Sequence, residues 1–283
     1  MIPANFDYAR AKSLRDALNV LAAGDSKCLA GGHSLIPMMR FRLAQPAKLI
    51  DIGALEELKG IEAKGRGARI GAGATYRDLL ESAVLAERYP LIAEATRGIG
   101  DVQVRNRGTI GGGLAHADPA SDMPAVMLAL DATMNLRSKD GKRSVSAKEF
   151  FKGAFETNLK DNEILVDIVL PPPPKKAGMA YVSFEQKASG YAIAAAAAMV
   201  TKSRKTITSV TLAMTGVGEM AYLADVSGAV NTHGETADLQ AAVANITQGV
   251  SVNGDIHASV EYRTHLAKVT AKRAIALALS RAG

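Results

Sequence analysis

Apolar residues along the first 170 positions follow two alternating patterns. Spacings of three and four residues are typical of helices, whereas short apolar runs bounded by turn residues are typical of strands. The first pattern predicts helices over residues 13–23, 35–43, 76–82, 90–97 and 123–130. The second predicts strands over residues 27–30, 49–52 and 164–170, and hairpins over residues 58–73 and 133–145. In this interpretation, residues 1–53 form a small β-α-β unit.

A run of four prolines, Pro171–Pro174, interrupts both patterns. Because proline has no amide hydrogen for a helix or a central strand, the run indicates a stiff connector and a domain boundary. The predicted fold class is α+β, with a flat or mixed sheet in residues 1–170 and a smaller sheet-plus-helix domain after the prolines. In that second domain the pattern predicts strands over residues 179–187, 191–201 and 206–215, then helices over 235–248 and 259–281.

The composition adds one restriction to this picture. Of the 283 residues, 48% are hydrophobic and 22% are charged, as in ordinary globular proteins, but Cys28 is the only cysteine. One cysteine excludes an internal disulfide. It also excludes an iron–sulfur cluster or a structural zinc site that needs several cysteines of this chain. The sequence therefore predicts no metal site of its own.

The chain is basic, with a formal net charge of +6. Its lysines and arginines are spread out, and only 5% of its residues are aromatic, so the sequence argues against nucleic-acid binding. The N-terminus has no apolar signal core. The longest apolar run, Tyr191–Val200, is about half as long as a membrane span requires. We expect no membrane span and a cytoplasmic location.

A first glycine-rich segment, LAGGHSLIP, covers residues 29–37, where a predicted strand turns into a helix. The pair Gly31–Gly32 permits positive φ angles and lets the backbone approach a ligand closely. Backbone N–H groups at such a turn bind anions, and Ser34 adds a hydroxyl. Taken alone, the segment is equally compatible with an ordinary tight turn.

A second segment, GTIGGGLAHADPASDMP, covers residues 108–124. Its consecutive glycines are expected to expose backbone donors again, and its side chains offer hydroxyls and carboxylates to sugar or polyol groups. The polar side chains are those of Thr109, Asp118, Ser121 and Asp122, although Asp122 also suits a helix N-cap. Two such segments about 80 residues apart suggest one phosphate-rich ligand held from two sides.

These two segments resemble the FAD-binding motifs of the flavoprotein subunit of molybdenum hydroxylases, the family of xanthine dehydrogenase and carbon monoxide dehydrogenase. The resemblance extends over essentially the whole chain and is greatest to the carbon monoxide dehydrogenase medium subunits. Neither glycine segment alone identifies this family, but the two segments together with four further matching stretches do. The further matching stretches are IPANFDY (2–8), DVQVRNRGTIGG (101–112), GMAYVSFEQKASGYAIAAAAA (178–198) and EYRTHLAKVTAKRAI (261–275).

The resemblance implies a particular fold. Residues 1–173 would form a two-part FAD-binding domain of the vanillyl-alcohol-oxidase (PCMH) type, with subdomains of about residues 1–53 and 54–173. Residues 174–283 would form the C-terminal domain of a carbon monoxide dehydrogenase flavoprotein. This boundary coincides with the one that the prolines indicate.

Carried over position by position, the resemblance also implies a set of FAD contacts. The first segment would wrap the pyrophosphate and ribityl chain, and residues 99 and 100 would line the adenine side. Leu165 would lie on a strand that borders the flavin, with Lys187 and Tyr191 near the ring. The implied cofactor-binding residues are Ala30, Gly31, Gly32, His33, Ser34, Leu35, Ile36, Ile99, Gly100, Gly108, Thr109, Gly111, Gly112, Gly113, Ala115, Asp122, Leu165, Lys187 and Tyr191.

Two positions depart from the family pattern. Gly113 stands where many relatives have asparagine, so one side-chain contact is absent or replaced. Gly190 stands where relatives often have aspartate, which bears on the flavin-ring contacts and the electron acceptor more than on FAD binding. A lysine such as Lys187 near the ring would favour the reduced, anionic flavin and raise its potential.

The implied activity is that of an oxidoreductase subunit that carries FAD and transfers electrons. It would accept electrons from iron–sulfur clusters of a small subunit and pass them to an external acceptor, while a large subunit oxidises substrate at a molybdenum cofactor. Relatives assemble as dimers of such three-subunit units, and no catalytic residue is expected in this chain. Two alternatives stay open at this point: a stand-alone flavin oxidase, tethered to FAD through Cys28 or His33, and a non-enzymatic binding or assembly subunit.

Overall fold

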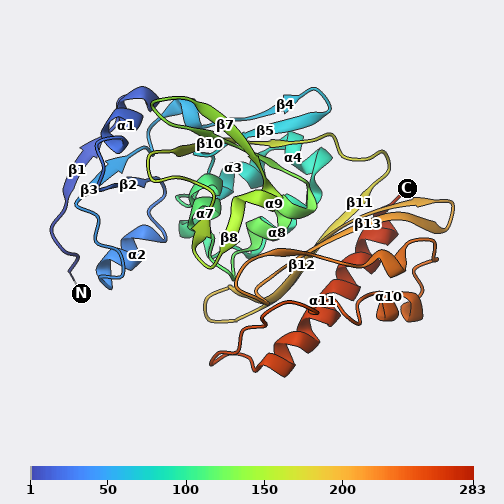
Figure 1. The fold of residues 1–283 in the computed structure, drawn as a ribbon. Helices are drawn as coiled ribbons and strands as arrows, with labels where there is room; N and C mark the ends of the chain where they lie inside the picture. Colours follow the sequence, from blue (N-terminus) through green and yellow to red (C-terminus); the bar gives the residue numbers. More distant parts are fainter. Residues whose placement is uncertain (1) are drawn as a thin grey trace.

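The chain begins with a small parallel sheet, seen in blue in the computed structural model, which describes residues 2–283 (Figure 1). The first two strands both pair with the third, which lies between them. The leucines of the first helix are buried against this sheet. The elements are β1 (Asp7–Arg10), α1 (Leu14–Leu21), β2 (Ser26–Leu29), α2 (Leu35–Arg40) and β3 (Lys48–Asp51).

A five-stranded antiparallel sheet follows, in the order β4-β5-β10-β6-β7. Its central strand, β10 (Ile164–Leu170), pairs with β5 on one side and β6 on the other, with a bulge between Leu165 and Asp167. The sheet therefore brings together strands from residues 61–71, 133–146 and 164–170. The other strands are β4 (Ile61–Lys64), β5 (Gly67–Gly71), β6 (Thr133–Arg137) and β7 (Lys142–Ser146).

Short helices pack against this sheet, and together they form the main hydrophobic core. The most buried of them is α8, in which every residue is buried because the helix lies between the two halves of the molecule (Figure 1). The helices are α3 (Tyr76–Glu81), α4 (Ala83–Arg88), α5 (Pro90–Gly98), α6 (Val102–Arg105), α7 (Ile110–His116), α8 (Asp122–Ala129) and α9 (Ala147–Phe150), with a hairpin of β8 (Phe151–Gly153) and β9 (Glu156–Thr157).

The C-terminal part is an antiparallel sheet in the order β11-β12-β13-β14, with the long helix α11 packed on it (Figure 1). The alanines of β12 are buried on both faces, because α11 covers one face and α8 the other. Their small side chains permit this close approach. The elements are β11 (Gly178–Glu185), β12 (Ala192–Ser203), β13 (Thr206–Thr215), β14 (Tyr222–Ala224), α10 (Thr236–Ala242) and α11 (Val260–Arg281).

The two halves are joined by polar contacts as well as by apolar packing. The Tyr181 amide donates to Glu94 at 2.8 Å, and Glu94 also pairs with Arg281 at 2.6 Å. The Thr215 hydroxyl, fully buried, lies 2.8 Å from the carbonyl oxygen of Ser121. The Glu94 contacts hold α5 against the C-terminal domain, and the Thr215 contact holds the second glycine-rich segment against the C-terminal sheet.

Most expected elements are present, with shifted ends. The helix expected over residues 35–43 ends at Arg40, the one expected over 235–248 ends at Ala242, and the strand expected from residue 58 begins at Ile61. The expectation of one flat or mixed sheet in residues 1–170 was wrong. That region holds a parallel three-stranded and an antiparallel five-stranded sheet. The expected β-α-β unit is present as the parallel pair of β2 and β3, whereas β1, a largely exposed strand, was not predicted.

Candidate cofactor site

The two glycine-rich segments meet at a cavity of about 640 Å³. That volume lies in the range of cofactor pockets. All but two of the predicted FAD-binding residues line it. The exceptions are Ile36 and Lys187, whose side chains are exposed and lie outside the lining, although Tyr191, close in sequence to Lys187, belongs to it. The structure thus brings together residues from positions 30 to 191.

The first segment contributes unused backbone donors. Within residues 2–283, no group accepts a hydrogen bond from the backbone N–H of residues 31, 32, 33 or 34, and all four residues line the cavity. Gly32 has a φ of +77°, which favours glycine. A row of free amides in such a turn is a typical anion-binding nest, so the segment fits the pyrophosphate of FAD.

Gly31 is required by packing between the two segments. A Cβ atom added to it would lie 2.2 Å from the carbonyl oxygen of Arg107, immediately before the second segment. An added Cβ on Gly32 would instead lie 2.7 Å from the Ile36 side chain. The first glycine therefore lets the two segments touch, and the second shapes the turn.

The second segment does not expose a row of backbone donors, so that expectation was wrong. Residues 110–116 form helix α7, whose first amides are all hydrogen-bonded within the protein: Ile110 to Ala74, Gly111 to Ala72, and Gly113 to the carbonyl of Thr109. The Gly112 amide donates to the Thr109 hydroxyl at 3.1 Å, which makes Thr109 the N-cap. This segment shapes the cavity wall.

A buried carboxyl stands beyond α7. Asp122 is 7% exposed, lines the cavity, and accepts a hydrogen bond from the Tyr181 hydroxyl at 2.5 Å. Burial raises the pKa of Asp122 to about 7, although the Tyr181 bond acts in the opposite direction. Burial likewise raises the pKa of Tyr191. Since Tyr181 belongs to β11, both halves of the molecule build this side of the cavity.

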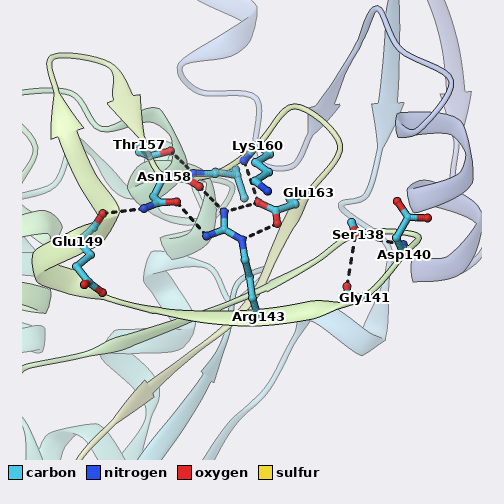
Figure 2. A network of polar contacts seen from close by, with 10 residues as sticks. Ser138, Asp140, Gly141, Arg143, Glu149, Thr157, Asn158, Lys160 and Glu163 are labelled. Atoms are coloured by element: carbon cyan, nitrogen blue, oxygen red, sulfur yellow. Dashed lines mark hydrogen bonds and ion pairs between the residues drawn. The ribbon is translucent and has the colours of Figure 1, made fainter.

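The sequence did not reveal an ion pair, Arg143 with Glu163, that supports the cavity wall near Leu165. Glu163 also lines the cavity, and Arg143 on β7 binds its two carboxylate oxygens, each at 2.7 Å (Figure 2). The same guanidinium donates to Asn158, and Glu163 accepts from the Lys160 amide (Figure 2). The Arg143 bond holds the pKa of Glu163 below its usual range. No local signal reveals this pair, because its partners lie 20 residues apart.

A second arginine holds the turn at residues 99 and 100, which also lines the cavity. Arg105 donates to the carbonyl oxygens of Ile99 and Gly100 at 2.9 and 2.8 Å. Gly190 lies opposite, where its φ of +77° and a distance of 3.2 Å from an added Cβ to the Gly98 carbonyl both favour glycine. Glycine at this position is therefore explained by local geometry.

Cys28 also lines the cavity, and its chemistry bears on the tethered-oxidase alternative. Burial raises the pKa of its thiol to about 11. The thiolate is the nucleophilic form of cysteine, so this thiol is poorly suited to forming a covalent flavin bond near neutral pH.

Two family models match the chain. The FAD binding domain in molybdopterin dehydrogenase matches residues 4–173, and the CO dehydrogenase flavoprotein C-terminal domain matches residues 179–278. Together with the cavity, they define the class of the protein: a flavoprotein of the molybdopterin dehydrogenases. No helix within residues 2–283 is long and apolar enough to cross a membrane.

Relatives match over the full length of the chain. The carbon monoxide dehydrogenase medium chain of Hydrogenophaga pseudoflava is 38% identical over 99% of this chain and 99% of its own length. The glyceraldehyde dehydrogenase medium chain of Sulfolobus acidocaldarius is also 38% identical, over 97% of this chain and 98% of its own.

Solved structures agree. A carbon monoxide dehydrogenase structure from Hydrogenophaga pseudoflava has a TM-score of 0.96 at 38% identity and covers 100% of both chains. Quinoline 2-oxidoreductase from Pseudomonas putida 86 has a TM-score of 0.95 at 32% identity, covering 100% of this chain and 99% of its own.

The chain therefore belongs to the family of FAD-binding medium subunits of molybdenum hydroxylases. It is an oxidoreductase subunit that carries FAD and transfers electrons, while the molybdenum cofactor and iron–sulfur clusters lie on other subunits of such complexes. The resemblance inferred from the sequence is confirmed. The stand-alone oxidase and the non-enzymatic module do not describe this family.

Proposed function

We propose that FAD lies in the cavity with its pyrophosphate on the backbone amides of residues 31–34. The proposal is supported by a row of four residues that all line one cavity and whose N–H groups have no acceptor within residues 2–283. Ser34 adds a hydroxyl beside them, and the turn at Ile99 and Gly100 borders the adenine side. The predicted residues of both segments, with Leu165 and Tyr191, complete the proposed site.

Bound FAD supplies reversible electron uptake and release. The residues of this chain bind and orient it. The amides of the first segment would donate hydrogen bonds to the pyrophosphate, and residues of α7 and β10 form part of the cavity wall. Asp122 is partly protonated near neutral pH, because burial raises its pKa to about 7. Ile36 and Lys187 are proposed as residues at the edge of the site, because both are exposed and lie outside the cavity lining.

The proposed site depends on two domains, residues 1–173 and 174–283. Two hydrogen bonds cross the proposed boundary, from Tyr181 to Asp122 and from Thr215 to Ser121, and each joins the cofactor segment to the C-terminal sheet. We infer that the C-terminal domain closes one side of the cavity. The family-model matches end at residue 173 and resume at residue 179, next to the proline run.

The proposed partners are a small iron–sulfur subunit and a large molybdenum subunit, arranged as a dimer of heterotrimers in the cytoplasm. The medium chains of related carbon monoxide and glyceraldehyde dehydrogenases support the three-subunit arrangement. The single cysteine supports it as well, since this redox chain has too few thiolates for a cluster of its own.

Flavin titration and co-purification test the proposal together. The full chain, freed of flavin, is expected to take up one FAD per chain with quenching of flavin fluorescence. Acid denaturation is expected to release that FAD intact. Affinity purification of the tagged chain from its own cells is expected to recover a cluster-containing and a molybdenum-containing subunit. Absence of FAD uptake would contradict the cofactor site, and recovery of the chain alone from native extract would contradict the partners.

A further inference from the structure

One polar group of the cavity has no partner in the fold. Tyr76, the first residue of α3, is 6% exposed and lines the cavity, yet no group in residues 2–283 forms a hydrogen bond with its hydroxyl. The hydroxyl oxygen lies beside Gly113, which lines the same cavity. It therefore points into the cavity, where it is free to bond a ligand.

The ring of Tyr76 is held in place by the second glycine-rich segment. The Tyr76 amide donates to the Gly108 carbonyl at 3.0 Å. A Cβ atom added to Gly108 would lie 3.0 Å from two ring carbons, so the ring packs directly on that residue. The side chain thus has a fixed direction, which is what a contact residue needs.

Gly113 shows where the hydroxyl lies. A Cβ atom added to Gly113 would lie 2.3 Å from the Tyr76 hydroxyl oxygen but 3.6 Å from the ring carbon that carries it. The first distance is a clash and the second is an ordinary contact. Position 113 is therefore small because the hydroxyl occupies the space in which its side chain would stand.

We propose that Tyr76 is a further FAD contact, whose hydroxyl donates a hydrogen bond to an acceptor atom of the cofactor beside α7. This rests on the proposed FAD site. The need for such a donor follows from α7, whose backbone amides are bonded inside the protein, so polar contact on this side must come from side chains. Burial, followed by the neighbouring Asp122 and Tyr191 charges, raises the pKa of Tyr76, and the hydroxyl keeps its proton.

The test is a double-mutant cycle on FAD affinity, measured by quenching of flavin fluorescence in the full chain. Tyr76→Phe removes one hydrogen bond and is expected to weaken FAD binding about tenfold. Gly113→Ala displaces the hydroxyl and is expected to weaken binding at least as much. Once the hydroxyl is gone, the added methyl group fits, so Tyr76→Phe/Gly113→Ala is expected to match Tyr76→Phe alone.

Tyr89→Phe is the matched control. Tyr89 is buried, and its hydroxyl donates to the Pro171 carbonyl at 2.7 Å, away from the cavity lining. It should lose stability without losing FAD affinity, and circular dichroism shows whether each variant folds.

The outcomes separate the two proposals. Wild-type chain that takes up no FAD would overturn the proposed function and this inference with it. Wild-type chain that binds FAD while Tyr76→Phe binds equally well would overturn this inference alone. Multiplying losses in the double variant would show that Gly113 is needed for another reason, which also contradicts the assignment.

Discussion

The two glycine-rich segments look alike in sequence but differ in what they offer a ligand. In the first, the amides of residues 31–34 have no acceptor within residues 2–283. In the second, the amides of residues 110–113 are bonded within the protein, because the segment is a helix capped by Thr109. The first segment therefore supplies donors, and the second supplies shape. Polar contact on the second side falls to side chains such as Tyr76 and Asp122.

The glycines of the two segments also differ in why they are small. Gly31 is small because the backbone of the other segment passes next to it, whereas Gly113 is small because a tyrosine hydroxyl stands there. A run of glycines thus indicates close approach without saying what approaches.

Gly31→Ala is expected to have the largest effect. The new methyl group would lie 2.2 Å from the Arg107 carbonyl, so the two segments must separate and the row of amides is disrupted. We expect FAD affinity to fall more than about 100-fold in a fluorescence titration. Gly53→Ala is the control, because Gly53 lines the same cavity. The nearest atom to its added Cβ is a side-chain oxygen of Asp51 at 3.3 Å, a much milder contact. Equal FAD affinity of the two variants would contradict the contact between the segments.

Arg143→Met tests the part of the cavity wall that the Arg143–Glu163 pair supports. It leaves Glu163, which is 8% exposed, without its bidentate partner, and is expected to lower the free energy of unfolding by about 2 kcal/mol. Glu163 has a depressed pKa, so the stability it contributes is present above its ordinary pKa of 4.5 and is lost as the pH falls through the folded-state value. The deficit of the variant, measured by urea unfolding, should therefore shrink in acid.

Lys148→Met is the control for Arg143→Met, because Lys148 pairs with Asp131 on the surface and such pairs contribute little. A deficit of the same size in both variants, or one that does not change with pH, would show that the Arg143–Glu163 pair does not support the wall.

Asp122→Asn tests the side-chain contribution of the second segment. The folded-state pKa of Asp122 is raised to about 7 from an ordinary value of 3.8, so the folded flavin-free chain holds a proton that the unfolded chain loses. Stability should fall as the pH rises between these values, by up to about 1.4 kcal/mol per pH unit, and level off above them.

An amide side chain does not titrate, so Asp122→Asn should remove this component of the pH dependence. Asp140→Asn, in an exposed turn, should leave it intact. Urea unfolding of the flavin-free chain between pH 5 and pH 8, roughly the range over which Asp122 titrates, provides the measurement. Identical pH profiles for wild type and Asp122→Asn would contradict the assignment.

Thr109→Val is expected to have the smallest effect. It removes the hydroxyl that accepts from the Gly112 amide, and loss of an N-cap typically costs about 1 kcal/mol. Thermal unfolding of the flavin-free chain should show the loss, and Thr109→Ser should largely restore stability. If the Thr109→Val variant were as stable as the wild type, the Thr109 cap would not stabilise helix α7.

The sequence predicted the parts of this protein in which local chemistry decides the structure. Ser13 indicated the start of α1, and its hydroxyl caps that helix at the Asp16 amide. The first glycine segment was expected to present free amides, and it does. Those features depend on neighbours in sequence, which a single chain displays directly.

Features decided by distant neighbours were missed. Glycine disfavours helices, yet α7 forms because tertiary contacts override propensity, as the bond from Gly111 to Ala72 shows. Tyr76 and Glu163 carry no local sign of their place at the cavity. Their roles arise from residues 37 and 20 positions away, Gly113 and Arg143, which only the fold brings next to them.

Hydrogen–deuterium exchange of the full chain, with and without FAD, tests whether the backbone amides of residues 31–34 hold the cofactor. Without FAD, the amides of residues 31–34 should exchange rapidly and those of residues 110–113 slowly, because only the latter are bonded within the fold. FAD should slow exchange at residues 31–34 and leave residues 110–113 nearly unchanged. Unchanged exchange at residues 31–34 in the FAD-bound chain would contradict the claim that these amides hold the cofactor.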